Sequence, residues 1–182
     1  MRPHDQSEQW VKVAIALVVE KMSPDPGQAP LDQKHSLIAQ SERTSGTHVL
    51  ITKRKAAQVL GGLWELPGGK VEPNESARQA VIRELREEVA IEVEPIARLE
   101  QVEYRYDHAH VRLIPFICKR IAGTPQALEV DELRWVSPQN LANYSFPKAS
   151  LPVIQSLAQW LKRNRETLKT IRNPTTDTPA AP

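Results

Sequence analysis

The chain has 182 residues, and its 40% hydrophobic and 25% charged residues are typical of one soluble globular domain. A formal net charge of +2 is too small to indicate a nucleic-acid or membrane partner on its own. The single cysteine excludes an internal disulfide, and no apolar run approaches the roughly 18 residues that a membrane-spanning helix needs. Because the first residues also lack the apolar core of a secretory signal, we expect a cytoplasmic protein without a membrane partner.

The N-terminal part of the chain combines strand patterns with loop composition. Residues 1–9 are expected to be a flexible N-terminus before one folded domain over residues 10–163. Apolar residues partly alternate over residues 11–19 and predict the first strand. From about residue 21 to 46 the chain is rich in Pro, Ser, Gln and Gly, which predicts a long loop or insertion. Residues 48–55, HVLITKRK, predict the second strand.

A helix is predicted after a glycine-rich turn. Leu66-Pro67-Gly68-Gly69 follows an apolar run, and paired glycines let the backbone approach a ligand closely. Ser76 with Gln79 makes a capping box, which predicts a helix that begins at about Ala77. Apolar residues then recur about every fourth position and form a stripe that would face a core: Ala77, Ala80, Val81, Leu85 and Val89.

Three carboxylates share another face of this helix. Glu84, Glu87 and Glu88 stand at i, i+3 and i+4, so they repel one another unless a cation lies among them. Carboxylate oxygens are the ligands that Mg²⁺ and Mn²⁺ prefer, and Mg²⁺ completes its shell with water and phosphate oxygens. Arg83 can hold Glu84 or Glu87 through its forked guanidinium. We interpret the helix as half of a metal–phosphate site, against the alternative of a solvated charged face.

Strand patterns return after the helix. Residues 97–106 and 111–120 predict two strands joined by residues 107–110 as a long hairpin, and residues 133–136 predict a short strand. Cys118 lies in an apolar run of the second of these strands, so a buried, inert thiol is favoured over a nucleophile.

Two helical signals precede a C-terminal tail. Ser137 as a cap and Pro138 at the first position predict a short helix. Residues 151–160 predict a closing helix, whose apolar stripe would be Leu151, Ile154, Leu157, Ala158 and Leu161. Residues 164–182 are expected to be a basic and then disordered tail, for which a solvated surface is favoured over nucleic-acid binding.

The segment from Gly69 to Ile91 resembles the Nudix box, the signature of the Nudix hydrolases. The positions that match are Gly69, Glu75, Arg83, Glu84, Leu85, Glu87, Glu88 and Ile91. Ala90 departs from the signature, because the family has glycine there. From about Val11 to Leu161 the order of elements is similar to the MutT-type group, which hydrolyses nucleoside triphosphates. The resemblance implies an α/β (α+β) fold, a Nudix-type α/β/α sandwich with a mixed β-sheet.

The resemblance also implies a set of site residues and a cofactor. Mg²⁺ is the implied cofactor, with Mn²⁺ as an alternative. The implied catalytic residues are Arg83, Glu84, Glu87, Glu88 and Glu129. The implied metal ligands are the Gly69 carbonyl with Glu84, Glu87, Glu88 and Glu129. The implied substrate contacts are Arg54, Leu66, Phe146 and Ser150. Glu84 and Glu129 both stay open as the group that activates water, and Glu132 remains a rival of Glu129.

The implied substrate is a nucleotide, and the resemblance leaves its base open. Ser150 stands where the MutT group has an asparagine beside the base, and a hydroxyl has one donor and a shorter reach than an amide. The implied reaction converts a nucleoside triphosphate, or a related nucleoside diphosphate derivative, to nucleoside monophosphate and pyrophosphate, with oxidised nucleotides such as 8-oxo-dGTP included. Pyrimidine triphosphates, dinucleoside polyphosphates, ADP-ribose and a non-catalytic module that binds a nucleotide or a DNA lesion are alternatives. A monomer and a homodimer are both open.

Overall fold

A computed structural model describes residues 10–22, 46–107 and 109–164 of the chain. The predicted flexible N-terminus (1–9), nearly all of the predicted insertion (21–46) and the tail from residue 165 lie outside the described residues. Those three predictions therefore stay predictions. The described strands reach into both ends of the predicted insertion, because one strand ends at Met22 and the next begins at Gly46.

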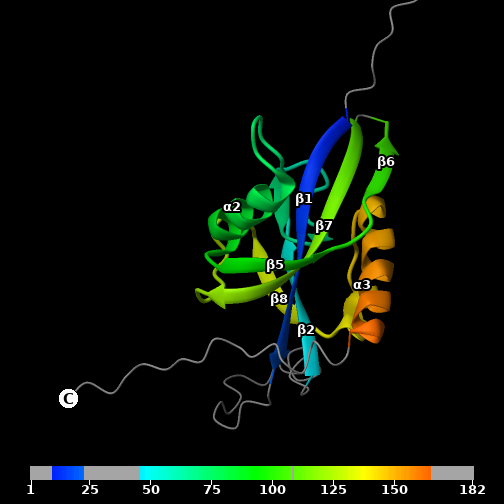
Figure 1. Ribbon diagram of the computed structural model, residues 1–182. Helices are drawn as coiled ribbons and strands as arrows, with labels where there is room; N and C mark the ends of the chain where they lie inside the picture. The colour runs from blue at the N-terminus through cyan, green and yellow to red at the C-terminus, as the bar shows by residue number, and fades with distance from the viewer. Residues whose placement is uncertain (1–9, 23–45, 108, 165–182) are drawn as a thin grey trace, which may run out of the picture.

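The described residues form one mixed sheet of eight strands between two α-helices (Figure 1). The strands are β1 (Trp10–Met22), β2 (Gly46–Lys53), β3 (Trp64–Glu65), β4 (Gly68–Lys70), β5 (Glu92–Arg98), β6 (Val102–Tyr106), β7 (Ala109–Ala122) and β8 (Glu132–Val136). The helices are α2 (Ala77–Val89), α3 (Leu151–Arg163) and the short 3-10 helices η1 (Pro138–Asn143) and η2 (Lys148–Ser150). None of the described helices is both long and apolar enough to cross a lipid bilayer.

The long central strands β1 and β7 run parallel, and every other strand pairing is antiparallel. The main order is β3-β2-β1-β7-β5, with β4 on β1, β6 on β7 and β8 on β2. One edge of β1 is shared along its length, because β4 pairs with Val13–Ile15 and β2 with Val19–Met22. This shared edge brings the glycine turn of β4 to the centre of the sheet.

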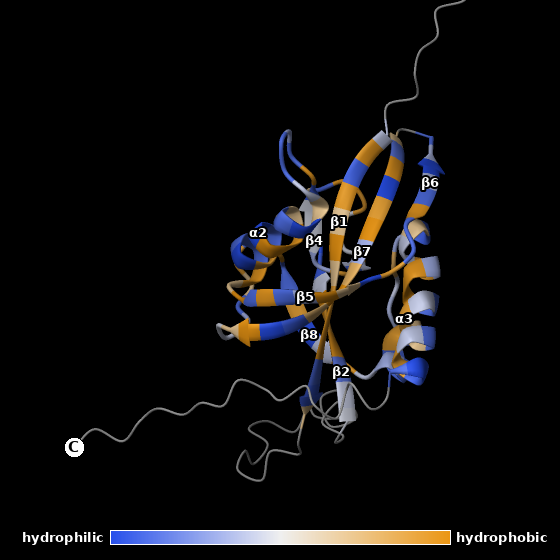
Figure 2. Ribbon diagram, viewed as in Figure 1, coloured by the Kyte–Doolittle hydropathy of each residue, from blue (hydrophilic) through white to orange (hydrophobic). Residues whose placement is uncertain are grey.

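The two faces of β1 supply two separate cores. Ile15, Leu17 and Val19 pack in one cluster with residues of α3, while Ala14 and Ala16 pack in the other with residues of α2. Successive side chains of a strand point to opposite faces, so a strand that is covered on both faces has a nearly continuous apolar sequence. Figure 2 shows β1 and β7 as the most hydrophobic strands, between helices with polar outer faces. The predicted α/β sandwich with a mixed sheet is confirmed.

Helix α2 begins as predicted and ends in a left-handed residue. The Ser76 hydroxyl accepts the Gln79 N–H at 3.2 Å, and the Gln79 side-chain oxygen accepts the Ser76 N–H at 2.9 Å, which is the predicted capping box. The predicted apolar stripe faces the sheet, with Ala77 less buried than the rest. Ala90 ends the helix at φ 58° and ψ 31°, where its N–H bonds the carbonyls of Arg86 and Leu85.

The predicted hairpin after α2 is correct around its turn and wrong in its first strand. Tyr106 pairs with Ala109, but residues 99–101 separate β5 from β6 where a single strand over 97–106 was predicted. The separation lies opposite Pro115, which has no N–H to donate to a partner strand. Cys118 is fully buried as predicted, and burial raises the pKa of its thiol.

Two details of the C-terminal helices were also wrong. Ser137 makes no capping hydrogen bond to the backbone, although η1, a short 3-10 helix, starts at Pro138 as predicted. In α3, Leu151 and Ala158 are exposed. The buried positions of α3 are Val153 and Leu157, of which Leu157 was predicted, and the predicted Ile154 and Leu161 pack against the same core.

Candidate active site

The turn that β4 makes toward α2 depends on two glycines. Gly68 has φ +143°, and a Cβ there would collide with the backbone of Ala14 and Ile15 on β1. A Cβ at Gly69 would collide with the Glu84 carboxylate. Glycine at position 68 therefore allows β4 to lie this close to β1, and glycine at position 69 leaves the Glu84 carboxylate in its place on α2.

Arg83 gathers the carboxylates of the box around one guanidinium. Its Nε and Nη2 donate to the two oxygens of Glu75 at 2.9 and 3.0 Å, and its Nη1 donates to Glu84 and Glu87 at 2.9 Å each. Nη2 also donates to the Lys70 carbonyl at 3.1 Å. These hydrogen bonds raise the pKa of Arg83 and lower the pKa of Glu75. Arg83 thus fixes the directions of three carboxylates and ties α2 to β4.

Glu88 is the most perturbed carboxylate of the site. Burial raises its pKa to about 8, and the neighbouring carboxylates of Glu65 and Glu84 add to the rise. The Gly68 N–H, which donates to Glu88 Oε2 at 3.0 Å, opposes it. Burial also raises the pKa values of Glu65 and Glu84. Three carboxylates are therefore partly desolvated in one region, and a cation there would relieve both their burial and their mutual repulsion.

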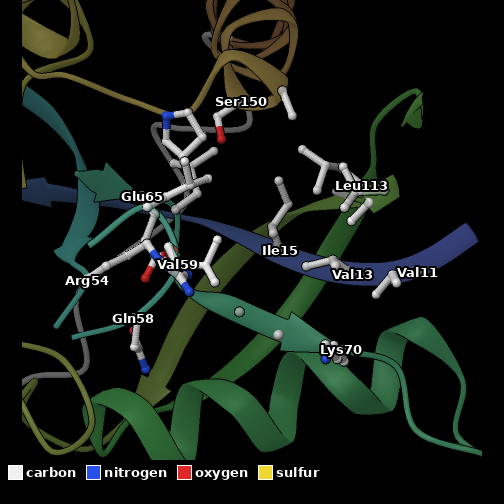
Figure 3. Close-up of a pocket in the computed structure, with 18 of the residues that line it drawn as sticks. Val11, Val13, Ile15, Arg54, Gln58, Val59, Glu65, Lys70, Leu113 and Ser150 are labelled. Carbon is white, nitrogen blue, oxygen red and sulfur yellow. Dashed lines mark hydrogen bonds and ion pairs between the residues drawn. The ribbon is translucent and has the colours of Figure 1, made fainter. Parts of the chain in front are cut away.

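A cavity of about 590 Å³ opens between the glycine turn, β1 and the start of α3 (Figure 3). Its polar lining residues are Arg54, Gln58, Glu65, Gly68, Gly69, Lys70, Glu84, Glu88, Tyr106 and Ser150. Its apolar lining residues are Val11, Val13, Ile15, Val59, Leu60, Leu66, Ala109, Val111, Leu113, Pro147 and Ala149. In Figure 3, Arg54 and Glu65 lie on one side, and Val11, Val13 and Leu113 lie on the other. The cavity thus suits a ligand that is charged in one half and apolar in the other.

Arg54 joins the charged side of this cavity to the loop after β2. Its Nη1 donates to Glu65 Oε2 at 2.5 Å, and its Nε donates to the Val59 carbonyl at 3.0 Å. The attraction of Arg54 opposes the rise in the Glu65 pKa, although burial is the larger effect. A guanidinium has five N–H donors, so Arg54 keeps donors that are free of these two bonds for a ligand.

The structure brings part of the predicted residue set to the cavity. Its lining includes Gly69, Glu84 and Glu88 of the predicted metal set and Arg54, Leu66 and Ser150 of the predicted substrate set. Ser150 is only 8% exposed, and Figure 3 draws its hydroxyl toward the cavity.

Four predicted residues do not line the cavity. Glu87 is bound to Arg83 with its side chain 49% exposed, and Arg83 itself lies behind Glu84 as the residue that holds it. Phe146 packs at the edge of the α3-side core. Glu129 is exposed, in a loop whose backbone N–H bonds the Glu88 carbonyl at 3.2 Å, and its rival Glu132 pairs with Arg134. The roles of Glu87 and Glu129 therefore stay predictions.

The carboxylates that line the cavity have the chemistry that a divalent cation requires. Glu84 and Glu88 offer hard, acceptor-only oxygens, and the Gly69 cradle leaves the Glu84 carboxylate room that a side chain would fill. Within the described residues, no three Asp, Glu, His or Cys side chains already stand close enough together to hold a metal. A hard divalent cation bound there would take Glu84, Glu88 and backbone oxygen as ligands, with water and phosphate to complete its shell.

Sequence reasoning missed much of the cavity wall. Val11, Val13 and Ile15 were treated only as strand residues, yet alternate residues of β1 face the cavity. Sequence reasoning assigned no role to Val59 and Leu60, which also line the cavity. The signal that could have identified Val59 and Leu60 is the position of two large apolar residues directly before a pair of glycines.

Known proteins resemble the chain in both sequence and structure. A family profile described as NUDIX domain matches residues 41–156, more than half of the chain. A CTP pyrophosphohydrolase of Escherichia coli (strain K12) is 40% identical over 112 residues, 59% of this chain and 80% of that protein. An 8-oxo-dGTP diphosphatase of the same strain is 36% identical over 115 residues, 63% of this chain and 89% of that protein. The solution structure of the E. coli ORF135 protein matches with a TM-score of 0.63 at 28% identity, over 87% of this chain and 95% of that one. With its glycine cradle, its acidic helix face and these relatives, the chain belongs to the Nudix family and is a Nudix hydrolase.

Proposed function

We propose that the protein hydrolyses nucleoside triphosphates to nucleoside monophosphate and pyrophosphate, with Mg²⁺ as its cofactor and Mn²⁺ as a substitute. The observation that carries the proposal is the divided chemistry of the cavity. Carboxylates, Arg54 and glycine backbone line one part, and valine and leucine side chains line the rest. A nucleoside triphosphate has the same division between its phosphates and its sugar and base.

The protein residues prepare the charged part for a metal–phosphate complex. When bound there, the cation would neutralise phosphate charge and lower the pKa of the attacking water. Glu84 and Glu88 would hold it with the Gly69 carbonyl, and Arg83 would keep Glu84 in place. Glu88 must release its proton first, because the pKa of about 8 leaves it mostly protonated at neutral pH without a cation.

Two further residues have proposed roles in the chemical step. Arg54 would contact phosphate, since it lines the cavity and forms a forked, permanently charged donor. Glu84 is favoured over Glu129 as the group that accepts a proton from water, because Glu84 lines the cavity while Glu129 is exposed outside it. Glu87, which shares Arg83 with Glu84, would act by completing the negative charge of the site.

Two substrate classes are supported by relatives, and one feature favours the pyrimidine. The named relatives act on CTP and on 8-oxo-dGTP. The segment made of Pro147 and η2 contributes three residues to the cavity wall: Pro147, Ala149 and Ser150. Among these three, Ser150 is the one with a polar side chain. A hydroxyl supplies one donor, whereas a purine edge with several polar atoms is matched better by an amide. We therefore place pyrimidine triphosphates first and oxidised purine triphosphates second.

The test measures pyrophosphate release from CTP, dCTP, dGTP and 8-oxo-dGTP, and AMP formation from ADP-ribose, with Mg²⁺ and with EDTA. Glu88→Gln is the informative variant, because its amide oxygen can still accept the Gly68 N–H and the neutral side chain resembles the protonated carboxyl. We expect an unchanged fold and a rate lower by a factor on the order of a hundred or more. Glu92→Gln is the matched control, since Glu92 pairs with Arg86 on the surface.

The outcomes separate the possibilities clearly. Mg²⁺-dependent release from a nucleoside triphosphate that is lost in Glu88→Gln and kept in Glu92→Gln supports the proposal. Turnover of ADP-ribose alone, or equal rates in Glu88→Gln and the wild type, would refute it. A rate on 8-oxo-dGTP that exceeds the rate on CTP would reverse the order of the two substrate classes.

A further inference from the structure

The loop between β2 and β3, residues 54–63, is a compact unit that forms part of the cavity wall. Its two ends are joined, because the Arg54 N–H donates to the Leu63 carbonyl at 3.0 Å and the Gly62 N–H donates to the Arg54 carbonyl at 3.1 Å. Inside it, the Gln58 N–H donates to the Lys55 carbonyl at 3.0 Å and the Gly61 N–H to the Gln58 carbonyl at 2.8 Å. The backbone of the loop is therefore held in a defined shape by its own hydrogen bonds.

This shape presents two large apolar side chains to the cavity. Val59 is 65% exposed and Leu60 is 38% exposed, and both line the cavity. The described part of the chain has four other exposed large apolar side chains (Ile96, Ile121, Leu128 and Leu151), and none of those lines it. Val59 and Leu60 belong to neither core cluster. Their apolar surface is thus available to a ligand and contributes little to the core.

The position of Leu60 carries a conformational cost. Its φ is 60°, in the left-handed region that leucine rarely adopts. The next two residues are glycines, which adopt this region readily, yet the left-handed residue is the leucine. Such strain persists only where the surrounding structure imposes it, and it is concentrated at functional sites. Packing in the protein core does not account for a leucine here, because Leu60 belongs to neither core cluster.

Arg54 places this apolar pair next to the charged part of the cavity. One guanidinium bonds both the Val59 carbonyl and the Glu65 carboxylate. Val59 therefore lies beside the Arg54 guanidinium, within reach of a ligand whose phosphates contact Arg54. Across the same cavity, β1 supplies Val13 and Ile15 (Figure 3).

We propose that Val59 and Leu60 form an apolar clamp on the sugar and base of the bound nucleotide. This inference rests on the proposed function and adds the residues that give affinity for the nucleoside half of the substrate. Aliphatic side chains have no hydrogen-bond donors or acceptors, so the clamp strengthens binding of every nucleoside without selecting a base. Base selection is left to the opposite wall, which includes Ser150.

The experiment measures dissociation constants by calorimetry in Mg²⁺ with three probes: the non-hydrolysable α,β-methylene analogues of CTP and dGTP, and inorganic tripolyphosphate. The variant carries Val59→Ala and Leu60→Ala together. We expect both analogues to bind about tenfold more weakly, by the same factor, because several buried methyl and methylene contacts are lost. Tripolyphosphate should bind as it does to the wild type. Ile121→Ala is the matched control, since Ile121 is 49% exposed and lies outside the cavity.

A second variant separates binding from folding. Leu60→Gly removes the side chain and also removes the left-handed strain, so the protein should be at least as stable as the wild type. Weaker analogue binding by this variant cannot then come from damage to the fold.

Analogue binding that is unchanged in the double variant would overturn the clamp, and so would an equal loss for tripolyphosphate. A factor that differs strongly between the two bases would overturn its lack of base selection. These measurements need no turnover, so they are independent of the hydrolysis test. A protein that binds the analogues through Val59 and Leu60 but releases no pyrophosphate would retain the clamp and refute the proposed function.

Discussion

Ala90 stands in a conformation that favours glycine, and replacing it should stabilise the protein. At φ 58° and ψ 31°, an L-residue places its Cβ too close to the neighbouring carbonyl oxygen, which costs roughly 1–2 kcal/mol. Glycine removes that cost but loses roughly 0.5–1 kcal/mol more conformational freedom on folding. The bonds from the Ala90 N–H to the helix carbonyls are backbone bonds and survive the change. The net gain for Ala90→Gly should be about 0.5–1 kcal/mol.

Thermal unfolding followed by circular dichroism measures this gain. For a chain of this size, 1 kcal/mol corresponds to a shift in Tm of roughly 2–4 °C, so a rise of about 1–4 °C is expected. Ala158→Gly is the matched control, because Ala158 is exposed inside α3 with ordinary helical geometry. The same chemical change there should lower stability by about 1 kcal/mol. If both variants lost stability equally, the left-handed cost assigned to Ala90 would be wrong.

Two other predictions concern the acidic face of α2. Glu87→Gln should reduce the rate of nucleotide hydrolysis on the order of a hundredfold while the fold stays intact, and a rate near the wild type would remove Glu87 from the site. In metal-free protein, the raised pKa of Glu88, about 8 against an ordinary 4.5, means that the folded state keeps a proton that the unfolded chain releases. The contribution of Glu88 to the free energy of unfolding should therefore be largest below about pH 4.5. This contribution should fall as the pH rises to about 8. Urea unfolding in EDTA at pH 5 and pH 8 measures this fall, which should be smaller in Glu88→Gln; an equal fall in the variant would assign it to other groups. Added Mg²⁺ should restore stability more at pH 8 than at pH 5, because the cation binds the ionised carboxylate.

Local patterns in the sequence predicted the parts of the site that lie close together along the chain. The capping box, the apolar stripe of α2 and the shared direction of Glu84, Glu87 and Glu88 depend on helical periodicity alone. Arg83 was expected to hold Glu84 or Glu87, and it holds both, together with Glu75 from before the helix. The contact with Glu75 depends on the path of the chain before α2, and helical periodicity gives no information about that path.

The break between β5 and β6 shows where strand patterns were insufficient. Apolar residues alternate at Ala97 and Leu99 and again, in the other phase, at Val102, Tyr104 and Tyr106. The change of phase coincides with the interruption of pairing with β7 opposite Pro115. A strand pattern describes one chain segment, whereas a ladder needs donors from both partners.

The sequence by itself determined the acidic helix face, its glycine turn and the membership in the Nudix family, because these depend on residues within one short segment. Only the tertiary structure decided how deeply Glu88 is buried, which strand residues line the cavity and where Val59 and Leu60 lie. The register of β1 against β7 and the closure of the β2–β3 loop bring together residues that are up to about one hundred positions apart, such as Val13 and Leu113. Burial, pKa and cavity shape arise from such long-range contacts, which no local period encodes.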